Sequence, residues 1–402
     1  MKKVSDFLVK NTLLIAMIII AIIFAVGTKG TLLNPQNITN LILQNAYVVV
    51  LAVGMLMCIL TGGNIDLSVG SVVCLVGAIA GELIVNRKMN IWLAIPICLM
   101  VGLLIGIWHG FWIAYVRIPA FIVTLTGMLL WRGVGLMVLD GLTLGPFPKN
   151  YRNLFNSYVP DVFNGKINIT SILIGLVTCA VVIFLKVAGR IHKKKKGYKV
   201  EKLYMLIIKT SITCLIIMTL TYMLSLHLGI PIILVLLAVI VLIYTFYTNK
   251  TVSGRYLYAF GGNEKAAKLS GINTNKVLFM AYANMSFLSA VAALMCVARF
   301  NSAAPGAGNG YEMDAIGSCF IGGASSFGGI GTVPGVVIGS FFMGIINNGM
   351  QLMQTIDTNQ QKAIKGLVLL AAVAFDILSK RKRKSIKRRS LFSNLMKKKE
   401  VA

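Results

Sequence analysis

The sequence predicts an all-α, polytopic integral membrane protein, a helical bundle of about 10–12 spans with broken helices. Three observations predict it. Hydrophobic residues make up 57% of the 402 residues, and charged residues make up 13%. Apolar runs of about twenty residues, the length that crosses a bilayer as a helix, recur along the whole chain. Glycines and polar residues interrupt some of these runs, as they do where a membrane helix is broken and its free backbone groups face protein or water.

The amino-terminal part of the chain contains five predicted spans. Residues 1–11 precede them, are basic, and are expected on the cytoplasmic side, where lysine and arginine are enriched. A polar segment, residues 34–40, separates the first span from the second. Pro119 precedes the fifth, in keeping with the preference of proline for helix starts. The five spans are residues 12–26, 41–60, 71–85, 91–116 and 120–139.

The segment between the second and third spans, Gly62 to Gly70, reads Gly-Gly-Asn-Ile-Asp-Leu-Ser-Val-Gly. Its paired glycines break the helix, and Asp66 stands where its carboxylate can accept hydrogen bonds from amides of the next helix. We predict that Asn64, Asp66 and Ser68 belong to the translocation pathway or its cytoplasmic gate. The alternative is that Asn64 and Asp66 only end and cap helices, which requires the same geometry.

Seven further spans follow a polar segment, residues 140–168, which is expected to be an external loop. The basic residues 190–196 and the basic tail 380–402 are both expected in the cytoplasm. An even number of crossings must therefore precede the tail, so residues 314–330 must cross, and their glycines would allow close helix packing. These spans complete a single transmembrane domain, residues 12–379. They are residues 170–187, 204–226, 230–247, 277–297, 314–330, 332–353 and 363–378.

A polar, helix-prone segment, residues 258–273, lies between the eighth and ninth spans. It contains good helix formers followed by a glycine, the pattern of a short helix with a glycine end. Its lysines favour the cytoplasm, so we predict that the loop 249–276 docks a soluble partner there. The alternative is an ordinary connecting loop that contains a short helix. The predicted contact residues are Gly262, Asn263, Glu264, Ala266, Ala267, Gly271 and Ile272.

Three asparagines lie within apolar spans: Asn284, Asn347 and Asn348. An amide at that depth costs free energy unless it is paired or faces water. We predict that these amides contact a transported sugar, whose hydroxyls need donors and acceptors together. The alternative is hydrogen bonding between helices without a ligand, which is common in membrane proteins.

The sequence argues against several other functions. The net charge of +27 is concentrated in loops and the tail, where it orients the protein and attracts anionic membrane lipid, so nucleic acid is not an expected partner. The seven cysteines and three histidines show no metal-ligand spacing, and no metal site is predicted. No catalytic residues are predicted, because the acids are scattered singly apart from Glu312 and Asp314, which suit the start of a helix. No phosphate-binding Gly-x-x-x-x-Gly-Lys-Ser/Thr loop is present, so no cofactor is expected and ATP would be bound by a separate subunit.

Five stretches of the sequence carry a family resemblance. One is Glu264-Lys-Ala-Ala267 with Gly271, and the others are residues 62–71, 118–125, 314–323 and 365–370. Together they resemble the ribose, xylose and multiple-monosaccharide permeases of ATP-binding-cassette (ABC) importers over nearly the whole chain. In these permeases a cytoplasmic coupling helix with Glu-Ala-Ala and a glycine sits in a groove of the ATPase. The forms Gly-Gly-Asn-Ile-Asp and Gly-Gly-Asn-Glu-Lys-Ala-Ala are most similar to the xylose and multiple-sugar branch.

The resemblance implies a type II ABC importer permease fold and inward movement of xylose or several pentoses and hexoses by alternating access. It also implies an ATPase subunit with two cassettes, an extracytoplasmic sugar-binding protein, and a second permease chain in a homodimer. The protein would be a multi-pass protein of the bacterial plasma membrane with both termini in the cytoplasm. A neutral sugar suits the lack of intramembrane charge that the sequence suggests. The alternatives are a branched-chain amino-acid ABC permease of related architecture and a polytopic membrane enzyme.

Overall fold

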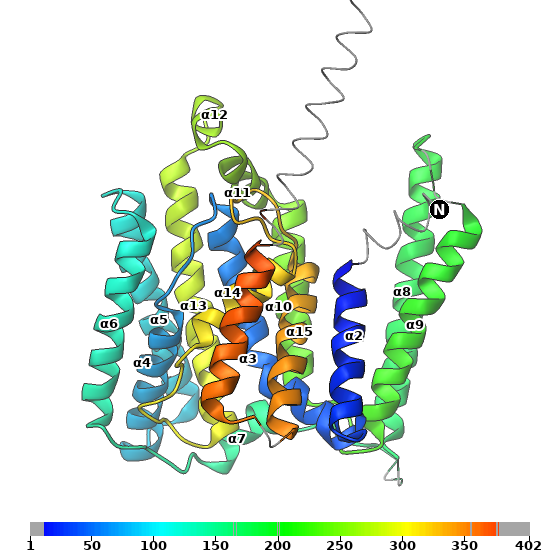
Figure 1. The fold of residues 1–402 in the computed structure, drawn as a ribbon, viewed down its shortest axis with the longest axis horizontal. Coiled ribbons are helices and arrows are strands. Elements are labelled where there is room, and N and C mark those ends of the chain that lie inside the picture. Colours follow the sequence, from blue (N-terminus) through cyan, green and yellow to red (C-terminus); the bar gives the residue numbers. More distant parts are fainter. Residues whose placement is uncertain are drawn as a thin grey trace, which may run out of the picture.

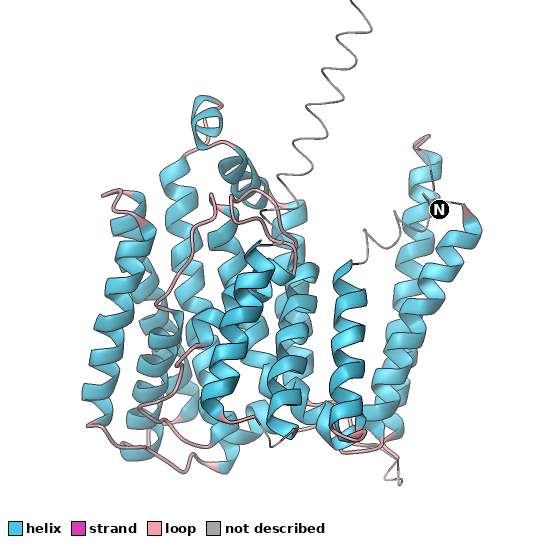
Figure 2. Cartoon of the chain, in the orientation of Figure 1, coloured by secondary structure: helices cyan, strands magenta, loops and turns pink. Residues whose placement is uncertain are grey.

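The computed structural model describes residues 12–163, 165, 167–198, 200, 202–353, 356–374 and 377. These residues form helices joined by loops and contain no β-strand (Figure 2). Nine of the described helices are long and apolar enough to cross a membrane. The predicted all-α, polytopic bundle is therefore confirmed. The predicted amino-terminal segment 1–11 and basic tail 380–402 lie outside the described residues.

The amino-terminal half contains the predicted spans with one shifted boundary. The second helix begins at Pro35, within the segment predicted to separate two spans. The Asn34 side chain caps it by accepting a hydrogen bond of 3.2 Å from the amide of Gln36, and proline occupies the first turn. The elements are α2 (Thr12–Gly27), η1 (Thr31–Leu33), α3 (Pro35–Leu60), α4 (Val69–Gly81), η2 (Glu82–Asn86), α5 (Ile91–Ala114), α6 (Ala120–Leu139) and α7 (Lys149–Asn156).

The second half adds long helices and a protruding pair of short ones. Helices α11 and α12 project from one side of the molecule, called here the α12 face, and α7 lies on the opposite face (Figure 1). Helix α2 begins on the α12 face, and the last described helix ends there (Figure 1). The elements are α8 (Ile169–Lys195), α9 (Leu203–Ser225), α10 (Ile232–Lys250), α11 (Val252–Gly262), α12 (Glu264–Leu269), α13 (Thr274–Phe300), α14 (Tyr311–Ile321), α15 (Val333–Leu352) and the helical residues 358–374.

Helix α3 is the centre of the bundle. Most of its length is buried, and it packs against α10, α13, α14 and α15. Helices α8 and α9 are the least buried of the spans. They lie together at one edge of the molecule (Figure 1), pack mainly on each other and leave most of their apolar surface exposed. In a membrane that surface would face lipid chains, which are as apolar as a protein core.

The first turn of α4 meets the non-helical segment before α14 inside the bundle, where Gly70 of α4 contacts Gly308. A Cβ atom on Gly70 would lie 2.1 Å from the carbonyl oxygen of Gly308, and one on Gly308 would lie 2.0 Å from the carbonyl oxygen of Gly70. Gly308 also has a φ of +78°, which disfavours other residues. Direct backbone contact of this kind requires glycine on both sides.

The crossing predicted at residues 314–330 has different boundaries. The structure makes it from the non-helical residues 301–310 followed by α14, which ends at Ile321 (Figure 1). The next residues form a turn on the α12 face, so the prediction that their glycines serve helix packing was wrong for Gly328 and Gly329. These two have φ values of +78° and +67°, and the amide of Gly329 donates to the carbonyl of Leu60 at 3.1 Å. Left-handed backbone, which glycine adopts easily, is the reason for this turn.

Candidate functional site

The protruding helix α12 has the predicted local structure. The Asn263 side chain caps its start by accepting a hydrogen bond of 3.0 Å from the amide of Ala266. Its end is closed by Gly271 at a φ of +83°, while the amide of Ile272 donates to the carbonyl of Ala267 at 3.1 Å. The predicted short helix with a glycine end is therefore confirmed.

The exposed surface of α12 differs in part from the predicted contact set. Ala267 is buried against the rest of the protein, whereas Gly262, Asn263, Ala266 and Gly271 are exposed. Glu264 and Ile272 are half-buried. Leu269, at the carboxyl end of the helix, is 90% exposed. The surface that a partner could contact thus has an apolar side chain at its tip.

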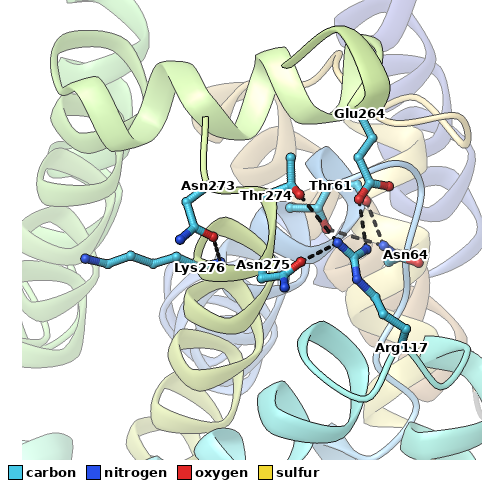
Figure 3. Close-up of polar contacts among 8 residues, drawn as sticks. All are labelled: Thr61, Asn64, Arg117, Glu264, Asn273, Thr274, Asn275 and Lys276. Atoms are coloured by element: carbon cyan, nitrogen blue, oxygen red, sulfur yellow. Dashed lines mark hydrogen bonds and ion pairs between the residues drawn. The ribbon is translucent and has the colours of Figure 1, made fainter. Parts of the chain in front are cut away.

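Arg117 ties α12 to the corner between α5 and α6 (Figure 3). Its Nη1 donates to Oε1 of Glu264 at 2.8 Å. Its Nη2 donates to the Thr274 hydroxyl at 3.4 Å and to the Asn275 side-chain oxygen. One guanidinium group therefore holds the first residue of α12 and the first turn of α13 together.

A groove of about 380 Å³ lies beside this contact on the α12 face. Asn64 and Glu264 both line it, so a residue predicted for the gate and one predicted for partner coupling face the same space. Asn64 is held there by a hydrogen bond of 2.7 Å from its Nδ2 to the carbonyl of Thr61. The other lining residues are Thr61, Gly62, Ile113, Arg117, Ile118, Pro119, Ala120, Phe260, Gly261 and Leu278.

Backbone contacts join three turns beneath the groove. A Cβ atom on Gly63 would lie 2.0 Å from the carbonyl oxygen of Ser326, and one on Gly261 would lie 1.9 Å from the carbonyl oxygen of Leu60. The Tyr258 hydroxyl donates to the carbonyl of Gly331 at 2.9 Å. The end of α3, the end of α11 and the turn after α14 therefore form one tightly packed unit.

Asp66 and Ser68 lie deeper and do not line the groove. Both are fully buried, and Oδ1 of Asp66 accepts hydrogen bonds from the amide of Ser68 at 2.8 Å and from its hydroxyl at 2.6 Å. These two bonds form a local turn just before α4 and are not the expected cap, because Ser68 precedes the helix and the start of α4 has no side-chain cap hydrogen bond. Oδ2 of Asp66 is buried and has no hydrogen-bond partner among the described residues.

The three intramembrane asparagines are in separate places. Asn348 exchanges two hydrogen bonds with Asn37 of α3, at 2.8 and 3.1 Å. Asn284 accepts a hydrogen bond from the hydroxyl of Tyr244 on α10. Asn347 lies near the carboxyl group of Asp314. The structure therefore does not gather these amides at one sugar site, and the sugar contacts remain a prediction.

The expected lack of intramembrane charge was wrong. Asp314, in the first turn of α14, pairs with Lys365 of the helix 358–374, with 3.2 Å between Nζ and Oδ1. Arg132 of α6 donates to the carbonyl oxygens of Pro305 and Ala307, at 3.3 and 2.5 Å. These charges are tolerated because each one is paired or hydrogen-bonded, as buried charges must be.

Comparison with known proteins decides the family. The family described as "Branched-chain amino acid transport system / permease component" matches residues 37–373. The xylose transport system permease protein XylH of Escherichia coli K12 is 35% identical over 367 residues, which cover 91% of both chains. XylH of Haemophilus influenzae is 36% identical over 370 residues, covering 92% of this chain and 96% of that protein. This chain belongs to that permease family.

A further relative extends the similarity of the permease to ribose systems. The ribose import permease protein RbsC of Haemophilus influenzae is 33% identical over 374 residues, which cover 93% of the permease and 95% of RbsC. No solved structure matches the permease. The resemblance to ABC permeases of the ribose and xylose group is confirmed over most of the chain.

Sequence reasoning missed three features of the permease. Arg117 was not predicted, although a cation directly before the Ile118-Pro-Ala motif at a span end was a usable signal. Leu269 was overlooked because its neighbours suggested a polar segment. The pairing of Asp314 with Lys365 had no local signal, because the two residues are 51 positions apart.

Proposed function

We propose that this permease moves a monosaccharide of the xylose and ribose class into the cytoplasm by alternating access, powered by an ABC ATPase subunit. The curated relatives described above are named for xylose and ribose transport, which supports the substrate class. The proposal covers a permease that carries xylose alone and a permease that carries several pentoses and hexoses. The chain supplies a transport path and the separate ATPase supplies ATP binding, so we assign the permease no reaction of its own.

The observation that carries the proposal is the link from α12 to the groove. Glu264 belongs to the protruding helix, and through Arg117 it contacts both the α5–α6 corner and the start of α13. The same groove reaches Asn64 in the break between α3 and α4. A rigid push on α12 from a docked ATPase would therefore reach helices on both sides of the groove. Alternating access needs this kind of mechanical connection.

We further propose the arrangement of partners. The ATPase, with two cassettes, would dock on the α12 face in the cytoplasm, and both termini would lie on that side of the bacterial plasma membrane. A sugar-binding protein would deliver substrate to the opposite face, and a second permease chain would complete the transport path. ATP would stay in the ATPase, and the permease would need no metal or other cofactor.

Uptake by the reconstituted importer tests the substrate class. The permease, the ATPase and the binding protein would be placed in vesicles with internal ATP and offered radiolabelled xylose, ribose or leucine. We expect ATP-dependent uptake of at least one sugar and none of leucine. ATP-dependent uptake of leucine alone would instead support the branched-chain amino-acid permease that the family description names.

Replacing Arg117 with alanine should uncouple the ATPase from transport. We expect sugar uptake to fall about tenfold or more, while the ATPase still co-purifies and stability changes by no more than about 1 kcal/mol, because an exposed ion pair contributes little to folding. Arg87→Ala is a matched control, since Arg87 forms an ion pair of 2.9 Å with Glu82 at the far end of α4. Uptake by Arg117→Ala within twofold of the unmodified permease would contradict the assigned link.

A further inference from the structure

A second cavity, separate from the groove, lies between α10 and α13. It has a volume of about 440 Å³, within the range of about 300–1,000 Å³ that small ligands occupy in proteins. Both helices pack on α3, whose Met57 contributes to the lining. Tyr256 and Leu257 of α11 line it as well. We call this cavity the α10–α13 cleft.

The cleft opens sideways, toward the surface that would face lipid. Ile243 of α10 and Met280 of α13 line it and are 57% and 52% exposed. Leu242 and Phe246, beside Ile243 on α10, are also exposed. Both helices are long and apolar enough to cross a membrane. The rim of the cleft would therefore touch the hydrocarbon part of the bilayer and not water.

The cleft has a charged side chain near its opening and a neutral amide deeper inside. Lys276 is in the first turn of α13 and extends away from the Arg117 contacts (Figure 3). It is the one charged residue that lines the cleft in the described part of the chain, and it has no acidic partner there. Asn284 lies eight positions further along α13, or about 12 Å deeper. Its Nδ2 is buried and has no hydrogen-bond partner among the described residues.

We propose that the α10–α13 cleft binds an anionic phospholipid. The phosphate would lie at Lys276, near the level where headgroups begin, and one acyl chain would follow the apolar wall of Val277, Met280 and Ala281 toward Asn284. An uncompensated lysine above an apolar channel selects a negative headgroup with a hydrocarbon tail, because each group is then in its preferred surroundings. The proposal does not depend on which solute the permease carries.

Native mass spectrometry of the purified permease tests this assignment. Phosphatidylglycerol or phosphatidylcholine would be added at equal concentrations, and the bound lipid per chain would be counted. We expect one tightly retained phosphatidylglycerol and weaker retention of phosphatidylcholine. Lys276→Gln should lower the affinity for phosphatidylglycerol about fivefold, because one basic residue beside an anionic headgroup contributes roughly 1 kcal/mol. Met280→Trp should reduce retention of both lipids by filling the channel.

Lys250→Gln provides the matched control, because Lys250 is an exposed lysine at the end of α10 that does not line the cleft. An equal loss of phosphatidylglycerol in Lys250→Gln and Lys276→Gln would overturn the proposal, since the lipid would then be bound non-specifically. Unchanged retention in a monodisperse Met280→Trp variant would also overturn it. Efficient disulfide cross-linking between two chains through Met280→Cys, above the background of the native cysteines, would show instead that a second copy of the permease covers the cleft.

Discussion

Leu269→Asp is expected to release the ATPase subunit from the permease. Leu269 is the most exposed large hydrophobic side chain among the described residues, at 90%, and it lies outside every candidate span. Apolar anchors at the centre of an interface each contribute about 2 kcal/mol or more, so the affinity should fall at least about thirtyfold. An aspartate at the same position would in addition carry an unpaired charge into the contact.

Co-purification of the ATPase with tagged permease measures this effect. Leu142→Asp is the control, because Leu142 is 65% exposed and follows α6 closely, and α6 ends on the side of the molecule opposite α12 (Figure 1). We expect the control to retain the ATPase fully. If Leu269→Asp also retained it fully, the tip of α12 could not be part of the docking surface.

Lys365→Met is expected to destabilise the permease strongly. The side chain of Asp314 is 3% exposed and pairs with Lys365 at 3.2 Å, so removing the lysine leaves a buried carboxylate without its counter-charge. Losing one partner of a buried ion pair typically costs about 3–5 kcal/mol. Methionine keeps much of the length of lysine, so the change isolates the charge from the packing.

Thermal unfolding in detergent, together with the amount of folded protein in the membrane, measures the loss. Combining Lys365→Met with Asp314→Asn should restore most of the stability, because neither charge is then left unpaired. Lys362→Met serves as the control on the same helix, since Lys362 is exposed. A double variant as unstable as Lys365→Met alone would show that the loss comes from packing and not from charge.

Local features were the most predictable from sequence. The helix at Glu264 and its end at Gly271 were both correct, because helix propensity and left-handed glycine depend on residues a few positions apart. The break after α3 was correct, because paired left-handed glycines end a helix locally. Asp66 was expected to cap α4, but its carboxylate bonds to Ser68, which precedes the helix. The contact between Arg117 and Glu264 was not predicted, because the two residues are 147 positions apart.

Hydropathy found the spans but could not show which of them are buried inside the protein and which are exposed. Helices α3 and α8 are similarly apolar, yet α3 is largely buried and α8 is largely exposed. A lipid chain and a protein interior are both apolar, so the residues of a span do not reveal which of the two surrounds it. The same ambiguity affected Asn348, which was predicted to contact sugar and is paired with Asn37.

The sequence by itself therefore determined the membrane class, the family and the short, glycine-ended helix α12. Only the tertiary structure decided which helix is central, where the charges pair, and how the break at Gly62 meets α11 and the turn at Gly328. The physical reason is the separation along the sequence over which each interaction acts. Hydropathy, capping and turn preferences act over one or two helical turns, whereas ion pairs and glycine backbone contacts join residues that the chain brings together from distant positions.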